Sequence, residues 1–186
     1  MLQTLSILVE NRAGVLNRVT SLFARRSFNI ESLAVGTTEN PAISRMTITM
    51  AGDQERVRQM TRQLYKLPDV LMVRHLNPVD HFSRELVFIK VSANAANRTQ
   101  VLQIVDIFRG HIIDVSPETI TIELSGKEDK IEALQALLEP YGILELVRTG
   151  TIAIERGQQV MNVTGSDHPS ANDHQEVSDE TDLQNR

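Results

Sequence analysis

The chain has 186 residues, with 19 Lys and Arg against 24 Asp and Glu, a formal net charge of −5, and no Cys. A hydrophobic fraction of 41% is enough for a packed core and argues against wholesale disorder, while the lack of Cys excludes disulfides and zinc–thiolate sites. No apolar run reaches the ~18–20 residues of a membrane span, and the N-terminus lacks a signal-peptide pattern, so we expect a cytoplasmic protein with no membrane partner.

The first half of the chain alternates between the period of a strand and the period of a helix. Strand-like segments occupy residues 3–10, 30–38, 45–50 and 70–76. Two helical stripes lie between them, one formed by Val15, Val19, Leu22 and Phe23, the other by Val57, Met60 and Leu64. The predicted order of elements is βαββαβ, with Gly52-Asp53 capping the second helix.

The same order of elements recurs in the second half. Strands are predicted at residues 85–93, 111–115, 119–124 and 143–154, and helices at 95–108 and 127–139. The fold class is therefore α+β, with two tandem ferredoxin-like βαββαβ units whose antiparallel sheets carry helices on one face. Such units leave one sheet face and two edge strands without cover, so we expect self-association into a homodimer or higher homo-oligomer.

Changes of composition divide the chain into four segments. We expect a first domain at 1–77, a linker at 78–83, a second domain at 84–157 and a disordered acidic tail at 158–186. The tail has six acidic residues against Arg186 alone, and it has no periodicity. The remaining body is neutral and poor in aromatics, which argues against nucleic acid as a partner.

Catalytic motifs are missing from the sequence. It contains no phosphate-binding glycine loop, no G-x-S-x-G and no H-E-x-x-H. The five His residues are scattered, so solvated or hydrogen-bonded imidazoles are favoured over metal ligands or acid–base groups. Arg58, Arg62 and Lys66 recur at helical spacing, which favours a solvated helix face over a docking surface for an acidic partner.

The loop Asn11-Arg12-Ala13-Gly14 is the strongest candidate for a binding site. It joins a buried strand to a helix that begins at Val15-Leu16. Gly14 permits close approach of a ligand to the backbone, the free amides of a helix start attract anions, and Asn11 offers both a donor and an acceptor. A small molecule with a carboxylate and an ammonium would fit, although the residues alone are equally compatible with a structural turn.

Several motifs resemble those of a known family. The segment Leu8-Val9-Glu10-Asn11-x-x-Gly14-Val15-Leu16, followed by Phe28-Asn29-Ile30-Glu31-Ser32-Leu33, is similar to the ACT domain, a βαββαβ amino-acid-sensing module. More specific matches link the chain to the small regulatory subunits of acetolactate (acetohydroxyacid) synthase. These matches are Ser44-Arg45-Met46-Thr47-Ile48, Phe108-Arg109-Gly110-x-Ile112-Ile113-Asp114-Val115 and Arg148-Thr149-Gly150. The resemblance covers about residues 1–157 and leaves out the tail.

The resemblance implies a regulatory role and no catalysis. Members of this family activate a thiamine-diphosphate-dependent large catalytic subunit and confer feedback inhibition by valine or another branched-chain amino acid. No metal or cofactor is then expected in this chain, while the catalytic partner would carry thiamine diphosphate, Mg²⁺ and FAD. A stand-alone amino-acid-binding ACT sensor with a different partner is the alternative, but it should bring a further effector domain, and none is visible.

The resemblance also implies an effector site at a dimer interface. Its predicted residues are Asn11, Gly14, Val15 and Leu16 from one chain with Asn29 and Ile30 from the other. The sequence does not indicate which branched-chain amino acid is preferred, because an aliphatic pocket separates ligands that differ by one methylene by only ~1–3 kcal/mol.

Overall fold

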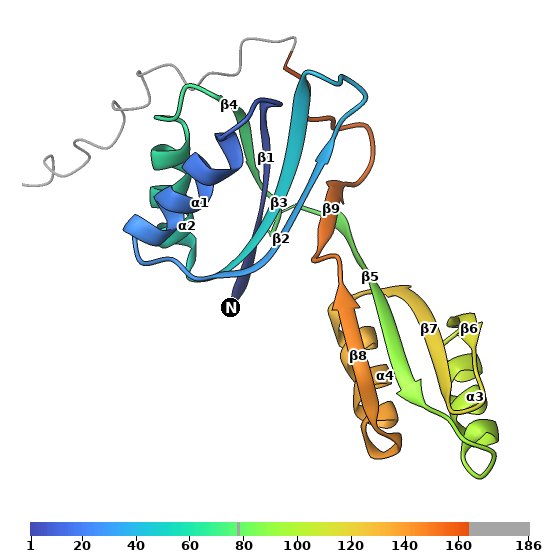
Figure 1. Ribbon diagram of the computed structural model, residues 1–186. Helices are drawn as coiled ribbons and strands as arrows, with labels where there is room; N and C mark the ends of the chain where they lie inside the picture. Colours follow the sequence, from blue (N-terminus) through green and yellow to red (C-terminus); the bar gives the residue numbers. More distant parts are fainter. Residues whose placement is uncertain (78, 164–186) are drawn as a thin grey trace, which may run out of the picture.

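The computed structural model describes residues 1–77 and 79–163. The first unit contains the predicted elements in the predicted order: β1 (Leu2–Glu10), α1 (Val15–Arg25), β2 (Ile30–Thr37), β3 (Ile43–Ala51), α2 (Gln54–Leu64) and β4 (Val70–His75). The sheet is antiparallel with strand order β2-β3-β1-β4, and both helices lie on one of its faces (Figure 1). Within the chain, β2 is therefore an edge strand.

The second unit repeats this arrangement. Its elements are β5 (His81–Ser92), α3 (Arg98–Ile107), β6 (His111–Val115), β7 (Thr119–Gly126), α4 (Glu128–Leu138), the 3₁₀ turn η1 (Glu139–Tyr141), β8 (Ile143–Arg148) and β9 (Ile152–Glu155). The strand order is β6-β7-β5-β8, again antiparallel, and β9 pairs with β5 outside this path. The predicted α+β class with two ferredoxin-like units is confirmed.

Each unit has its own hydrophobic core between its sheet and its helices. In the first unit, alternation along β1 places Leu5, Ile7 and Val9 against the predicted stripe of α1, where Phe23 is fully buried. The second helix begins at the predicted cap, because the Asp53 carboxylate accepts a hydrogen bond of 2.8 Å from the backbone N of Arg56.

The largest difference from the predicted elements lies between the units. The expected closing strand 143–154 is split into β8 and β9 by a turn around Gly150, which has a φ of +78°. β9 then pairs with the first four residues of β5, so the predicted linker 78–83 is strand from His81 onward. The pairing partner is about 70 residues away along the chain, which is why the local pattern did not indicate a strand.

β9 and the segment after it cover the helix-free face of the first sheet. On that face Leu8 and Leu76 are buried although neither belongs to the helix-side core. Glu155 of β9 lies there, with its Oε2 3.6 Å from the Nε of Arg74. Of the predicted tail, residues 158–163 are described and contain no helix or strand, whereas 164–186 lie outside the described residues. No helix in the described part of the chain is long and apolar enough to cross a membrane.

A buried ion pair joins β5 to the end of β8. The Glu85 side chain is 5% exposed, and its Oε1 accepts a hydrogen bond of 2.9 Å from Nε of Arg148. A second hydrogen bond runs from Nη2 of Arg148 to Oε2 of Glu85. This hydrogen-bonded carboxylate raises the pKa of Arg148. Glu85 also accepts the backbone N–H of Gly150 at 3.2 Å, so one carboxylate holds both the strand end and the turn.

Removing this carboxylate should destabilise the second unit. Glu85→Ala leaves a partly buried guanidinium and a backbone amide unpaired, and we expect a loss of about 2–3 kcal/mol, somewhat below the value for a fully buried pair because Arg148 is partly exposed. Glu145→Ala is the matched control, since it removes an exposed ion pair with Lys90 across the same two strands and should cost under ~1 kcal/mol. Urea unfolding followed by circular dichroism measures both, and equal losses would contradict the anchoring role of Glu85.

Candidate functional site

The loop between β1 and α1 leaves the start of the helix open. Gly14 is the N-cap residue, with a left-handed φ of +84°, and no side chain caps the helix. No backbone bond within the described residues takes up the amides of Leu16 and Asn17. No acidic side chain occupies the first turn either. Unpaired amides and the positive end of the helix dipole therefore suit the carboxylate of a ligand.

A cation lies beside this helix start. The Arg18 Nε donates a 2.7 Å hydrogen bond to the carboxylate of Asp69, which fixes the direction of the side chain. A Cβ added to Gly14 would lie 3.3 Å from one terminal nitrogen of Arg18. The guanidinium therefore adjoins the loop and adds positive charge where a ligand carboxylate would bind.

Asn11 is held in place by the turn between β2 and β3. Its backbone N–H donates to the carbonyl of Ala42 at 2.7 Å, and its side-chain Nδ2 donates to the carbonyl of Pro41 at 2.8 Å. Its Oδ1 has no protein partner among the described residues. A fixed amide with a free acceptor can receive a hydrogen bond from an ammonium group.

The two apolar residues predicted for this site point in different directions. The Val15 side chain is 2% exposed and packs in the core, so it can offer a ligand only its backbone. The Leu16 side chain is 42% exposed and is available for apolar contact. The family resemblance implies both residues, and the predicted helical stripe already assigns Val15 to the buried face.

The other predicted residues lie at the far end of α1. Asn29 is exposed, and its Nδ2 donates to Glu31 at 2.7 Å, while Ile30 begins β2 and partly packs on the core. The eleven residues of α1 separate this end from Gly14 by roughly 16 Å. A single chain thus does not bring the six predicted residues together, because four of them lie at the start of α1 and two lie beyond its end.

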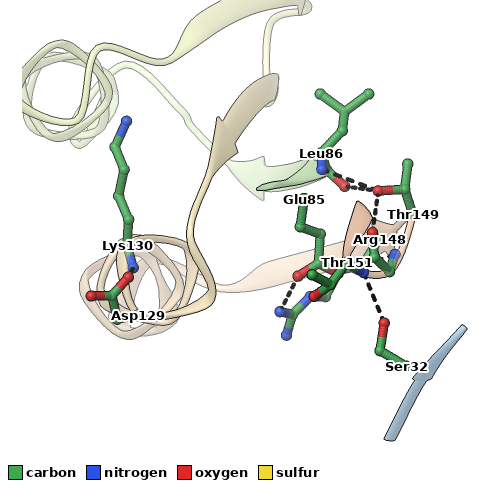
Figure 2. Close-up of polar contacts among 9 residues, drawn as sticks. Ser32, Glu85, Leu86, Asp129, Lys130, Arg148, Thr149 and Thr151 are labelled. Atoms are coloured by element: carbon green, nitrogen blue, oxygen red, sulfur yellow. Dashed lines mark hydrogen bonds and ion pairs between the residues drawn. The ribbon is translucent and has the colours of Figure 1, made fainter. Parts of the chain in front are cut away.

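The strand β2 also contacts the second unit, a contact that the sequence prediction missed. The backbone N–H of Thr151 donates to the Oγ of Ser32 at 2.8 Å, as Figure 2 shows. A Cβ on Gly150 would lie 2.8 Å from this Oγ and 3.1 Å from the carbonyl oxygen of Leu33, so only glycine fits against β2. In the sequence, Ser32-Leu33 belongs to the motif that resembles the ACT domain, and Thr149-Gly150 to a motif that resembles the small-subunit family, but neither motif indicates that the two segments touch.

The turn that reaches β2 is itself fixed to β5. The backbone N–H of Thr149 donates to the carbonyl of Leu86 at 3.0 Å, and its Oγ1 accepts from the N–H of Leu86 at 3.1 Å (Figure 2). Together with the bonds to Glu85, these contacts make the turn a bonded link between the second sheet and β2.

Across the described residues, no group of three His, Cys, Asp or Glu side chains is arranged to hold a metal ion.

Two family models match the chain. One describes the ACT domain of acetohydroxyacid synthase small subunits and matches residues 5–72, and the other describes the small subunit of acetolactate synthase and matches residues 84–157. Residues 73–83, at the junction between the two units, lie between the two matches.

Individual relatives agree with these models. The chain is 46% identical over 160 residues to the acetolactate synthase small subunit of Haemophilus influenzae, covering 86% of this chain and 98% of the relative. It is 49% identical over 154 residues to that of Mycobacterium bovis, covering 83% and 92%. The crystal structure of the acetolactate synthase small subunit from Thermotoga maritima superposes with a TM-score of 0.81 at 40% identity, covering 86% of this chain and 99% of that one.

Two glycine substitutions can separate the steric effect of the contact between Gly150 and β2 from the energetic cost of a positive φ. Gly150→Ala and Gly157→Ala both force alanine into a positive φ, at about 1–2 kcal/mol, but a Cβ at Gly157 would meet nothing within 4 Å. We expect Gly150→Ala to lose a further ~1–3 kcal/mol through the clash with β2. Urea unfolding gives the two stabilities, and hydrogen exchange at the Thr151 amide should accelerate only in the Gly150 variant. The same loss and the same exchange in both variants would rule out a tight contact.

Proposed function

Because the chain belongs to the acetolactate synthase small-subunit family, we propose that it activates the thiamine-diphosphate-dependent catalytic subunit and makes it sensitive to valine or another branched-chain amino acid. The family consists of regulatory subunits and not of catalytic ones. Thiamine diphosphate, Mg²⁺ and FAD then belong to the catalytic partner. The observation that carries the effector role is the open, cation-flanked start of α1 beside the fixed acceptor of Asn11.

The proposed ligand pose follows from the groups at the loop. The carboxylate of the amino acid binds the amides of Leu16 and Asn17 and the guanidinium of Arg18, and the ammonium group donates to Oδ1 of Asn11. The aliphatic side chain contacts the exposed part of Leu16. A free amino acid provides this combination of charges and apolar surface, whereas a simple anion would leave Asn11 unused.

A second copy of the chain completes the proposed site. Asn11 is bonded to the β2–β3 turn, so the loop lies near the end of β2, whereas Asn29 lies near its beginning. Antiparallel pairing of two β2 edges about a two-fold axis would bring the beginning of one β2 to the end of the other. Asn29 and Ile30 of the partner subunit would then face Asn11 and Leu16, which explains why one chain holds the halves apart.

The contact at Ser32 supports a route from this site to the second unit. Ser32 follows Ile30 by two residues on the same strand and accepts the amide of Thr151. A ligand that orders the beginning of β2 therefore acts on a strand that is already bonded to the second unit. Differential binding to two positions of β2 is what regulation at this site requires.

Gly14→Asp tests the effector loop in the enzyme reconstituted with its catalytic subunit. The new carboxylate would pair with Arg18 and occupy the anion position, so valine inhibition should be lost while activation is retained. Gly14→Asn is the matched control, because it has the same size and tolerates a left-handed φ but carries no charge. We expect the valine concentration for half-inhibition to rise at least about tenfold more for Asp than for Asn, which corresponds to about 1.4 kcal/mol.

The readout is acetolactate formation against valine concentration, with and without the small subunit. Equal inhibition of the Asp and Asn variants would move the site away from this loop. Failure of the unsubstituted chain to activate the catalytic subunit would instead favour a stand-alone amino-acid sensor.

Asn29→Ala tests the other half of the proposed site. Loss of a hydrogen bond to a charged ligand group typically costs about 1.5–3 kcal/mol, so valine should bind roughly 10- to 100-fold more weakly by titration calorimetry. Asn94→Ala removes an exposed asparagine of the second unit that only caps a turn, and it should leave the affinity unchanged. An unaltered dissociation constant in the Asn29 variant would remove this residue from the site.

A further inference from the structure

A cavity lies on the opposite face of the first sheet from α1 and α2. It has a volume of about 260 Å³ and is enclosed by β1, β3, β9 and the segment 159–161. Ser6 of β1 and Arg45 of β3 face it, because they alternate with core residues that point to the helices. Glu155 of β9 completes its polar lining.

Three buried polar atoms in this cavity have no hydrogen-bond partner. Within the described residues, four buried side-chain nitrogen or oxygen atoms lack a hydrogen-bond partner, and three of them, Ser6 Oγ, Arg45 Nε and Glu155 Oε2, belong to residues that line this one cavity. Glu155 Oε2 has only its longer ion pair with Arg74, at 3.6 Å. Ser6 is 1% exposed and the Glu155 side chain 9%. Such atoms are rarely left unpaired in folded proteins, because each one costs stability. Their convergence in one place therefore indicates a ligand.

The charges around the cavity specify what kind of ligand fits. Arg45 supplies a cation and Glu155 an anion, with Glu39 at the cavity wall and Arg74 3.6 Å from Glu155. A lone anion would face two carboxylates, and a lone cation would face two guanidinium groups. A molecule that carries both charges meets an opposite charge at each end.

The remaining lining favours an organic molecule over water. Leu76, Ala153, Val160 and Met161 present apolar side chains to the cavity. The volume is several times the ~30 Å³ that one water occupies, and each buried water needs two to four polar partners. The polar groups can bind the charged end groups of a ligand, and the apolar lining offers its aliphatic body a contact that water does not use.

We propose that this cavity is a second binding site, which takes a free aliphatic amino acid. The carboxylate binds Arg45 and the Ser6 hydroxyl, the ammonium binds Glu155, and the side chain packs against Leu76 and Met161. The site is distinct from the loop at Gly14, which opens at the start of α1. A ligand here contacts the first sheet and β9 together, so it fastens the second unit to the first.

The test uses the full chain carrying Gly14→Asp, so that the proposed loop site is silent. Calorimetry with L-valine, L-leucine and L-methionine should still show one binding site per chain for at least one of these amino acids. Leucinamide and N-acetyl-leucine, which each lack one charge, should bind at least tenfold more weakly than leucine. Glu155→Gln should weaken binding roughly 10- to 100-fold, and Ser6→Ala should weaken it less. Glu145→Gln, on the exposed face of β8, is the control and should change nothing.

A second measurement reports the position directly. With methyl-labelled Met161 and Ala153, the titrated amino acid should shift both signals in the Gly14→Asp chain, and Glu155→Gln should abolish the shifts. Absence of binding by all three amino acids, binding unaffected by Glu155→Gln, or a high-resolution structure with only water in the cavity would overturn the proposal. Because Gly14→Asp leaves this cavity intact, such a failure says nothing against the effector loop, which valine inhibition of the unsubstituted enzyme tests independently.

Discussion

The continuity of β5 is the constraint on which the arrangement of the two units depends. Its first four residues pair with β9, and the rest of the strand lies between β7 and β8 in the second sheet (Figure 1). A strand paired along its length cannot bend freely, so the units are joined by an ordered ribbon instead of a flexible linker. The turn between β8 and β9 lies at Gly150, where the backbone packs tightly against Ser32 and Leu33 of β2.

The two proposed ligand positions lie beside different parts of the first sheet. The edge strand β2 begins at the proposed dimer contact and touches the second unit at Ser32. On the helix-free face of the same sheet, the cavity around Arg45 lies between the sheet and β9. As proposed, a ligand at either position would act on the placement of β5 and β9, without a change in the two separate hydrophobic cores.

Elements whose partners follow from local periodicity were predictable. Alternation of Leu5, Ile7 and Val9, and the stripe that contains Phe23, determine both the type of element and its buried face. The pairing of β9 with the start of β5 was not predictable, because Phe82 and Ser83 gain their strand partners from residues about 70 positions later. The periodicity of a short segment does not indicate which distant strand it pairs with.

Some of the local geometry at the candidate site could be predicted from the sequence. Gly14 and Asn11 were identified from the chemistry of a loop before a helix, and the structure gives Gly14 the left-handed conformation that such a loop needs. The inward direction of Val15 agrees with its place in the predicted stripe of α1, whereas the bonds that hold Asn11 to the β2–β3 turn depend on a contact 30 residues away that the motif does not encode. The roles of Ser32 and Gly150 arise only where two units meet, so no single segment reveals them.

The order in which the ribosome delivers these elements has a consequence for biogenesis. All six elements of the first unit are made before residue 80, yet the strand that covers its helix-free face, β9, is made after residue 150. For most of synthesis the nascent chain therefore exposes Leu8 and Leu76 on an uncovered sheet with a free edge, a surface that is prone to aggregation. The finished junction forms only when the second unit is nearly complete. A chain that ends before β9 would therefore lack the strand that covers this face of the first sheet.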